Sequence, residues 1–246
     1  MKFKGTAAMM AAFISLGIYY FFIDLPAEKK KTQEKEITGK VLPLKIANVS
    51  EFSLIKKNQT ITLQQNTNNI WNLSQPFKVA GDNPEAESFL SAIEALEKSR
   101  VVESNPNNLS HYGLDAPAFK IHIKFKDGGE DTLLLGDDSP MGENIYLKLK
   151  SDPAVLLAAT SKTTFDKSVY QFRDKTIFNF SSGSITKIQI KRNEHPLDLI
   201  REKEEWKVSG EVRTKADKDA VFAFLQAIQF ARVKEFVNEK SDSLEP

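Results

Sequence analysis

The sequence predicts an α+β protein, in which an N-terminal transmembrane helix precedes repeated units of mainly antiparallel sheet with packed helices, the second unit being incomplete. Three observations predict this fold class. Residues 5–23 carry no charge, the only two tryptophans, Trp71 and Trp206, mark the same point of an internal repeat, and apolar residues alternate with polar residues over several segments. These features divide the chain into a membrane anchor (1–23), a charged linker (24–45), a first repeat unit (46–176) and a second, truncated unit (177–246).

The uncharged N-terminal segment is long enough to cross a bilayer, since its 19 residues, 5–23, would form a helix about 28 Å long. Aromatic residues at positions 19–22 would lie at the membrane interface. The alternative, a cleaved signal peptide, would have a shorter apolar core and an Ala-x-Ala-like site, whereas Leu25 stands at the −3 position before Ala27. We therefore expect an uncleaved anchor that contacts the membrane through residues 5–23.

The flanking charges leave two orientations open. Lys2 and Lys4 precede the span, but four lysines follow it between positions 29 and 35, so the positive-inside rule would place the globular part in the cytoplasm. The short basic head before the apolar run instead resembles an export anchor, and we expect export. The linker, bounded by Pro26 and Pro43, is rich in lysine and glutamate and predicts a solvated spacer, with contact to anionic headgroups as its alternative.

The internal repeat has a period of 135 residues, which is the distance between the two tryptophans. An aspartate follows each tryptophan after eleven residues, at Asp82 and Asp217, and is expected to cap a helix. In the first copy Glu85 would complete a capping box, and the helix would run to about Lys98. Apolar residues recur with helical spacing at equivalent positions, namely Ala86, Phe89, Leu90, Ile93 and Leu96 against Val221, Phe224, Leu225, Ile228 and Ala231.

Strands are expected in front of each helix. In the first unit they cover residues 46–56, 60–65 and 71–73, and the second unit repeats them, with a slip of one residue, around a turn at 192–196. After the first helix, alternation over 119–125 predicts a half-buried strand, and the Asp-Gly-Gly turn that follows returns the chain as a hairpin. The remaining expected elements are a strand at 132–135, a turn at 137–142, strands at 145–149 and 154–159, and a short helix at 163–172.

Composition excludes several classes of function. A net charge of +1 lacks the basic excess of a nucleic-acid-binding protein, so we expect no nucleic-acid partner. The absence of cysteine excludes disulfides, thiolate catalysis and cysteine-ligated metals. With 41% hydrophobic and 27% charged residues the chain is typical of a globular protein, and disorder is not expected for most of it.

No group of residues has the spacing of a catalytic or metal site. The histidines at positions 111, 122 and 195 lack metal-ligand spacing and are expected at the surface. The Ser-x-x-Lys matches at 53–56 and 184–187 fall in expected strands without their companion motifs. Five acidic residues gather around a hairpin without EF-hand-like spacing: Asp127, Glu130, Asp131, Asp137 and Asp138. We therefore assign no catalytic, cofactor-binding or metal-ligating residue, and expect no cofactor.

Other conspicuous residues have structural interpretations. Trp71 and Trp206 could stack on sugars or a peptide, but a tryptophan in an apolar strand more often packs in the core. Gly113, after Tyr112, is expected to turn the chain at positive φ. The charged segment 173–175 could dock a partner, or its side chains could cap and pair within their own domain.

A series of short motifs follows the first helix: Leu109-Ser110-His111-Tyr112-Gly113-Leu114-Asp115-Ala116-Pro117, Leu135-Gly136, Pro140-Met141-Gly142, Tyr146 and Phe172-Arg173-Asp174-Lys175. In this order, with a tryptophan strand ahead and a second copy behind, the chain resembles the bacterial DUF4340 family over residues 46–246. The family name records a domain of unknown function. The resemblance implies membrane-anchored extracytoplasmic proteins that are often encoded beside ABC-2-type transporter components and the auxiliary proteins of gliding-motility-type systems.

The second copy lacks the later motifs of the first. In the register of the repeat, Leu244 corresponds to Leu109 and Pro246 to His111, so the sequence stops before a second Tyr-Gly-Leu turn. We expect a fragment or a truncated reading frame, in which the apolar sheet face under the second helix is partly exposed.

These observations favour a non-enzymatic module, held in the bacterial inner membrane by one span, whose soluble part is periplasmic and contacts ABC-2-type transporter subunits and their auxiliary proteins. A cytoplasmic orientation stays open. So do two alternatives: an envelope enzyme acting on cell-wall or polysaccharide material through carboxylates such as Asp131 and Asp138, and a ligand-binding domain with a site between the two units.

Overall fold

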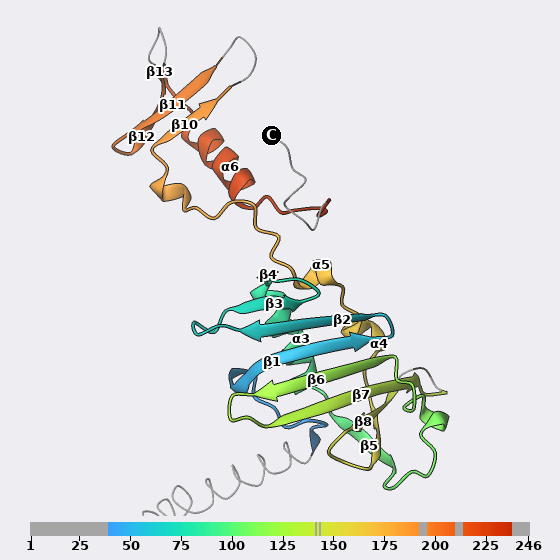
Figure 1. Cartoon of the computed structure of the whole chain (residues 1–246). Helices are drawn as coiled ribbons and strands as arrows, with labels where there is room; N and C mark the ends of the chain where they lie inside the picture. Colours follow the sequence, from blue (N-terminus) through green and yellow to red (C-terminus); the bar gives the residue numbers. More distant parts are fainter. Residues whose placement is uncertain (1–38, 141, 143, 192–195, 210–213, 238–246) are drawn as a thin grey trace, which may run out of the picture. The chain divides into compact units, whose positions relative to one another are not determined.

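The computed structural model describes residues 39–140, 142, 144–191, 196–209 and 214–237. The chain divides into two compact units, Met1–Arg173 and Asp174–Pro246, and the described part of each combines an antiparallel sheet with at least one α-helix (Figure 1). This is the α+β class that the sequence predicts. The expected anchor at 5–23 lies outside the described residues, and within the described ranges no helix is long and apolar enough to cross a membrane.

Unit 1 is built on a nine-stranded sheet in the order β4-β3-β2-β1-β6-β7-β8-β9-β5, and its neighbouring strands are antiparallel. The strands are β1 (Val49–Lys56), β2 (Gln59–Gln65), β3 (Trp71–Gln75), β4 (Val79–Ala80), β5 (Lys98–Glu103), β6 (Phe119–Phe125), β7 (Glu130–Asp138), β8 (Ile145–Leu149) and β9 (Val155–Ala158). Alternation along β6 buries Phe119, Ile121 and Ile123, which confirms the half-buried strand that the sequence predicts.

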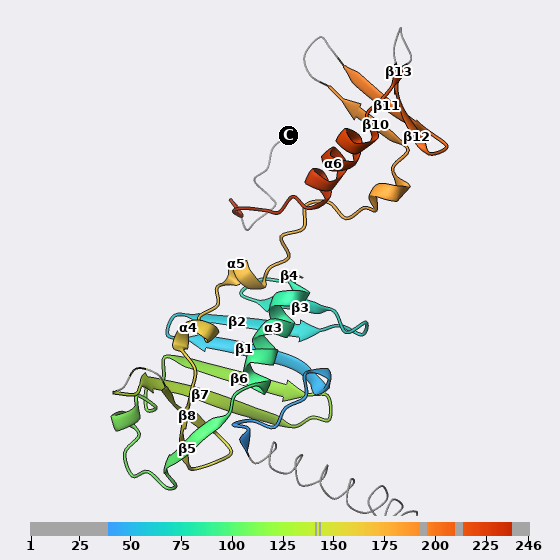
Figure 2. The same cartoon turned by 180° about the vertical axis from the view of Figure 1, so that it is seen from behind.

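Helix α3 (Asn83–Glu94) packs across one face of this sheet (Figure 2). As predicted, Asp82 is its N-cap, and the Asp82 carboxylate accepts a hydrogen bond from the Glu85 N–H at 3.1 Å. The Glu85 carboxylate, which the capping-box pattern directs toward the N-cap, instead lies 2.7 Å from Lys167 Nζ. The helix also ends before the predicted Lys98, because that residue begins β5, which pairs with β9.

Two short helices, α4 (Lys162–Phe165) and α5 (Val169–Phe172), replace the single helix that the sequence predicts over 163–172. The break occurs because Ser168 starts a second helix, forming a capping box with Gln171. Each helix ends on a fully buried phenylalanine, so the pair closes the core of unit 1.

The core of unit 1 centres on Phe52 of β1. The centroid of its ring lies 5.2 Å from the ring centroids of Trp71 and Phe89, and 5.7 Å from that of Phe172. The Phe89 ring also lies 6.0 Å from Phe165. Edge-to-face and offset contacts of this kind stabilise a fold by about 0.5–1.5 kcal/mol each beyond area burial. Trp71 is fully buried here, so its interpretation as a core residue is confirmed.

The end of the predicted linker belongs to the folded unit. Val41, Leu42 and Leu44 are buried in the core of unit 1, and the Val41 N–H donates to the Leu96 carbonyl at 3.0 Å. The assignment of all of 24–45 to a solvated spacer is therefore wrong at its C-terminal end, because three apolar side chains close together can pack where the lysine and glutamate run before them cannot.

Unit 2 repeats the opening elements of unit 1. Its four strands form a sheet in chain order, β10-β11-β12-β13, and a single α-helix follows in the described residues. The elements are β10 (Lys187–Ile190), β11 (Leu197–Glu202), β12 (Glu205–Ser209), β13 (Thr214–Lys215) and α6 (Lys218–Gln229). Of the predicted turn at 192–196, only residue 196 lies within the described residues.

Strand registers show that the repeat is structural. The pair Ile188↔Leu199 reproduces Phe52↔Leu63, and the bridge Thr176↔Arg232 reproduces Lys40↔Glu97. Helix α6 has the bounds of α3 displaced by the 135 residues that separate the tryptophans. Asp217 caps α6 by accepting hydrogen bonds from two backbone N–H groups, and Trp206 is buried. The predicted repeat is thus confirmed.

The repeat supplies a matched pair of substitutions. Phe89→Ala is expected to lower the free energy of unfolding by about 3–5 kcal/mol, because a large buried side chain is lost from a closed core. Phe224→Ala, at the equivalent position of α6, is expected to cost about 1–2 kcal/mol, because that ring is 38% exposed. Denaturant unfolding followed by tryptophan fluorescence, to which each unit contributes one tryptophan, measures both. Equal losses would contradict the difference in packing.

Candidate interaction surface of the second unit

The acidic residues that the sequence groups around one hairpin separate in the structure. At one end of β7, Asp131 accepts hydrogen bonds from the Thr132 N–H at 2.7 Å and from the Ser151 hydroxyl. His122 joins this group, since its Nδ1 lies 3.1 Å from Thr132 Oγ1 and its Nε2 lies 3.5 Å from a Glu130 oxygen. These residues line an open pocket of about 270 Å³ and engage one another.

The other two carboxylates lie at the far end of the same strand. Asp137 and Asp138 both approach Lys162 Nζ, at 3.5 and 3.6 Å. Asp138 lies seven positions beyond Asp131 along β7, a distance of about 23 Å in an extended strand. Paired carboxylates that cleave a glycosidic bond lie about 5–10 Å apart, so these two do not form such a pair. Over the described residues, no group of three or more His, Asp and Glu side chains could hold a metal ion.

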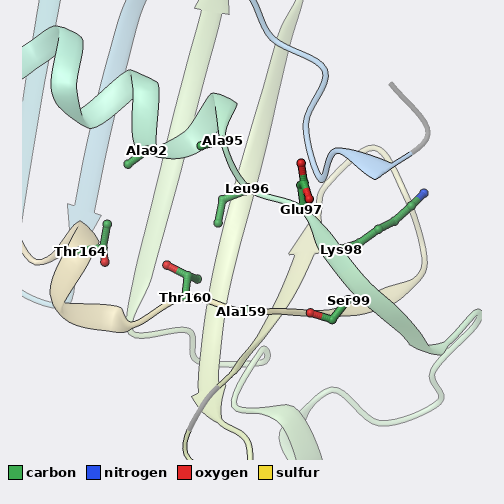
Figure 3. Close-up of a pocket in the computed structure, with 9 residues that line it drawn as sticks. All are labelled: Ala92, Ala95, Leu96, Glu97, Lys98, Ser99, Ala159, Thr160 and Thr164. Atoms are coloured by element: carbon green, nitrogen blue, oxygen red, sulfur yellow. The ribbon is translucent and has the colours of Figure 1, made fainter. Parts of the chain in front are cut away.

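A larger pocket of about 450 Å³ lies between the C-terminal end of α3, the start of β5 and the segment before α4 (Figure 3). Thr160 and Thr164 face it, while the Lys98 side chain extends away from them. The Glu97 carboxylate on its rim is paired with Lys40 at 3.0 Å. The hydroxyls of this pocket therefore have neither a histidine nor an unpaired carboxylate beside them among its lining residues.

Several motif residues that carry the family resemblance contact one another and have a structural role. Gly113 has φ of 64°, as predicted, and closes a turn whose Tyr112 hydroxyl donates to Glu103 at 2.7 Å. The Tyr112 ring lies 5.1 Å from that of Tyr146. A side chain at Gly136 would meet the Tyr112 carbonyl oxygen at 2.1 Å, so glycine is required for this close approach.

The three residues of segment 173–175 make contacts within the chain. The Arg173 guanidinium lies over the Phe77 ring at 5.2 Å, and an Asp174 carboxylate oxygen accepts the Thr176 N–H at 2.9 Å. The Lys175 carbonyl accepts the Val233 N–H at 2.9 Å. These contacts favour the interpretation that the segment pairs within its own domains over the interpretation that it docks a partner.

Unit 2 exposes apolar side chains at positions whose equivalents in unit 1 are buried. The exposed fractions are 48%, 50%, 39% and 38% for Ile177, Phe178, Leu197 and Phe224. Their equivalents belong to one core cluster and are at most 6% exposed: Val41, Leu42, Ile61 and Phe89. We call Ile177, Phe178, Leu197 and Phe224 the exposed apolar set. The expectation of a partly exposed sheet face under the second helix is met at Leu197 of β11 alone within this set, because Leu199 and Trp206 of the sheet are buried.

The later elements of unit 1 explain this difference. In unit 1, β6 pairs with the outer edge of β1, and the rings of Phe165 and Phe172 lie against Phe89. Within the described part of unit 2, β10 is paired with β11 alone, and Phe224 has no ring contact of that kind. The sequence offers one signal for this surface, because the register of the repeat assigns each of these exposed residues an equivalent position in unit 1.

The pairing of β1 with β6 includes an ion pair on the face away from the core. Lys124 Nζ lies 2.8 Å from Glu51 Oε1 across the two strands. Burial opposes the charge of Glu51, but the hydrogen bonds from Gln64 and Lys124 and the positive charge of Lys124 outweigh it, so the pKa of Glu51 lies below its usual value. The same hydrogen bond raises the pKa of Lys124.

A pH-dependent stability difference follows from the pKa of Glu51. Because that pKa is lower in the folded chain, the contribution of the Glu51 carboxylate is present above pH about 4.5 and is lost as the pH falls through the folded-state pKa. Glu51→Gln is therefore expected to lower the free energy of unfolding by about 0.5–1 kcal/mol at pH 7 and by much less at pH 3. Denaturant titrations at the two pH values measure this. A loss of equal size at pH 3 would contradict the charge argument.

The sequence was compared with models of known protein families, and one family matches. The profile of the family described as Domain of unknown function (DUF4340) matches residues 71–246, from Trp71 at the start of β3 through all of unit 2. The matched region leaves out β1 and β2, although Phe52 of β1 packs against Trp71, so the structural unit begins earlier than the family match. The comparisons with curated proteins and with solved structures found no match to the chain. The chain belongs to the DUF4340 family.

Proposed function

We propose that the chain is a membrane-anchored, extracytoplasmic interaction module without enzymatic activity, which contacts ABC-2-type transporter subunits and their auxiliary proteins in the bacterial envelope. The observation that carries this proposal is the exposed apolar set of unit 2. Its four side chains occupy positions whose equivalents in unit 1 are core positions, and large apolar side chains left at a surface can mark contact with a partner.

Two further observations support the proposal. The uncharged segment 5–23 would hold the module at the membrane, where transporter subunits lie. The family resemblance implies genes beside those of ABC-2-type transporters. The carboxylates of β7, which an envelope enzyme would use, engage Ser151 and Lys162 at opposite ends of one strand instead of converging.

A ligand-binding role on cell-wall or polysaccharide material is the second candidate. One pocket of unit 1, of about 480 Å³, favours it, because Lys56, Lys57 and Lys120 line that pocket and could attract an anionic polymer. Lys56 is already paired with Asp166 and lies over the Phe119 ring, which leaves less of its charge for a ligand. This role does not account for the exposed apolar set.

Export of the module can be tested because the chain has no cysteine. A Glu87→Cys variant would carry one thiol on the exposed face of α3. In spheroplasts, a membrane-impermeant maleimide is expected to label this thiol without lysis. Labelling that appears only after the membrane is broken would place the module in the cytoplasm and contradict the proposed localisation.

Partner binding is tested by purifying the full-length chain from bacterial membranes in mild detergent and identifying bound proteins by mass spectrometry. We expect ABC transporter subunits to be recovered, and Phe178→Ser to reduce their yield about 10-fold, because it removes an exposed aromatic ring that the partner would cover. Ile70→Ser is the matched control, since Ile70 is a similarly exposed apolar residue of unit 1. Failure to recover any transporter subunit with the unsubstituted chain would count against the proposal, as would equal losses in both variants.

A further inference from the structure

We propose that the pocket at the C-terminal end of β1 binds the phosphate group of an anionic phospholipid, with Lys57 and Lys120 as its cationic groups. This inference rests on the membrane anchoring in the proposed function and goes beyond the partner contact. The pocket has a volume of about 480 Å³ and lies where the end of β1 runs beside the start of β6 (Figure 1). All of its lining residues belong to unit 1.

The pairing of β1 with β6 forms this pocket. The register sets Ile55 opposite Lys120, and the turn after β1 brings Lys57 beside the segment 116–118 that leads into β6. Residues directly opposite each other in an antiparallel pair have their side chains on the same face. Because the alternate residues of both strands are buried in the core, Ile55 and Lys120 lie on the outer face of the sheet.

The lining combines cations with small apolar groups. Its charged side chains are those of Lys56, Lys57 and Lys120, and no carboxylate is among the described lining residues. The other lining residues are Ile55, Ala116, Pro117 and Ala118. An ammonium group donates hydrogen bonds and accepts none, so a ligand has to supply the acceptors. A lysine binds phosphate as a point charge, and the apolar residues favour a ligand that also carries an apolar part.

Two of the three lysine charges are available to such a ligand. The Lys56 ammonium is held by Asp166. Lys124, on the same face of β6 as Lys120, is paired at 2.8 Å with a glutamate of β1. Within the described ranges, by contrast, neither Lys57 nor Lys120 forms an ion pair, and both residues are exposed. The pocket therefore presents two cations whose charge is not neutralised by the protein.

An anionic phospholipid meets both requirements of the pocket. Its phosphate supplies charge and acceptors, and its glycerol and first methylene groups supply the apolar part. The anchor expected at 5–23 would keep such lipids within reach, because the 15 residues 24–38 can span at most about 50 Å. Each lysine near an anionic bilayer surface strengthens binding about 5-fold.

An acidic polysaccharide fits this pocket less well. Its anionic groups would also be attracted by Lys57 and Lys120, but its hydroxyl groups need acceptors as well as donors. The described lining side chains offer ammonium donors and apolar groups and contain no acceptor. Sugar hydroxyls would therefore be left without side-chain partners on the wall of alanine and proline.

The test uses the full-length chain in mild detergent, with a fluorescent probe attached to an Asn58→Cys variant. This thiol would be the only one in the chain and would lie in the exposed turn beside Lys57. Titration with short-chain phosphatidylglycerol is expected to change the probe emission, with about 10-fold weaker binding of zwitterionic phosphatidylcholine and of inorganic phosphate. Inorganic phosphate binding as tightly as the lipid would show a free-phosphate site, and tighter binding of dextran sulfate would show a polymer site. Either outcome would overturn the inference.

Substitutions of single lysines locate the binding. Lys57→Gln and Lys120→Gln are each expected to weaken binding of phosphatidylglycerol about 5-fold. Lys45→Gln and Lys78→Gln are the matched controls, since both lysines are exposed in unit 1 and neither lines the pocket. The controls are expected to bind within about 2-fold of the unsubstituted chain. Equal losses in all four variants would show a general attraction of charge and contradict a site at this pocket.

A pair of variants of equal shape tests the wall of the pocket. Ala118 is exposed and lines the pocket, so Ala118→Asp would place a carboxylate beside the lysines and is expected to abolish lipid binding. Ala118→Asn, which adds no charge, is expected to bind within about 3-fold. Equal binding by both variants would contradict the inference. Absence of lipid binding with intact recovery of transporter subunits would count against this inference alone, and lipid binding without such recovery would count against the proposed function alone.

Discussion

The contact between Phe89 of α3 and Phe52 of β1 is the interaction on which the rest of unit 1 depends. Their ring centroids lie 5.2 Å apart, and Trp71, Phe165 and Phe172 surround them. A sheet with one apolar face has to be covered, and here a capped helix and two short helices cover it. Unit 2 has the equivalent helix and the first strands, but within the described residues it lacks the rest of the cover, and its apolar residues are exposed for that reason.

Much of this architecture could be predicted because the same sequence pattern occurs in both copies of the repeat, so each copy supports the interpretation of the other. The spacing from tryptophan to aspartate fixed α3 and α6 together, and both N-caps are as expected. The end of α3 could not be predicted, since the apolar spacing continues past Glu94 and only pairing with β9 makes Lys98 the start of a strand. The burial of Val41 and Leu42 could not be predicted either, because a charged run precedes them and Leu96, which accepts the hydrogen bond of the Val41 N–H, is distant in sequence.

The sequence predicts which positions of the two units are equivalent, but it does not predict which residues of unit 2 are exposed. The repeat register in the sequence sets Leu197 against Ile61 and Phe224 against Phe89, so the positions to compare follow from the sequence. Which residues are exposed depends on how β10 and α6 sit on one another, and Phe178 and Leu197 stand out only when compared with Leu42 and Ile61 in the folded repeat.

Hydrogen–deuterium exchange on the chain bound to its transporter partner, compared with the chain alone, tests the central claim most directly. The account predicts that amides of β10 and α6 in unit 2 become protected in the complex, while amides of β1, whose edge β6 already covers, exchange as before. Unchanged exchange across β10 and α6, with protection confined to unit 1, would contradict the claim that the uncovered surface of unit 2 is where this protein binds its partner.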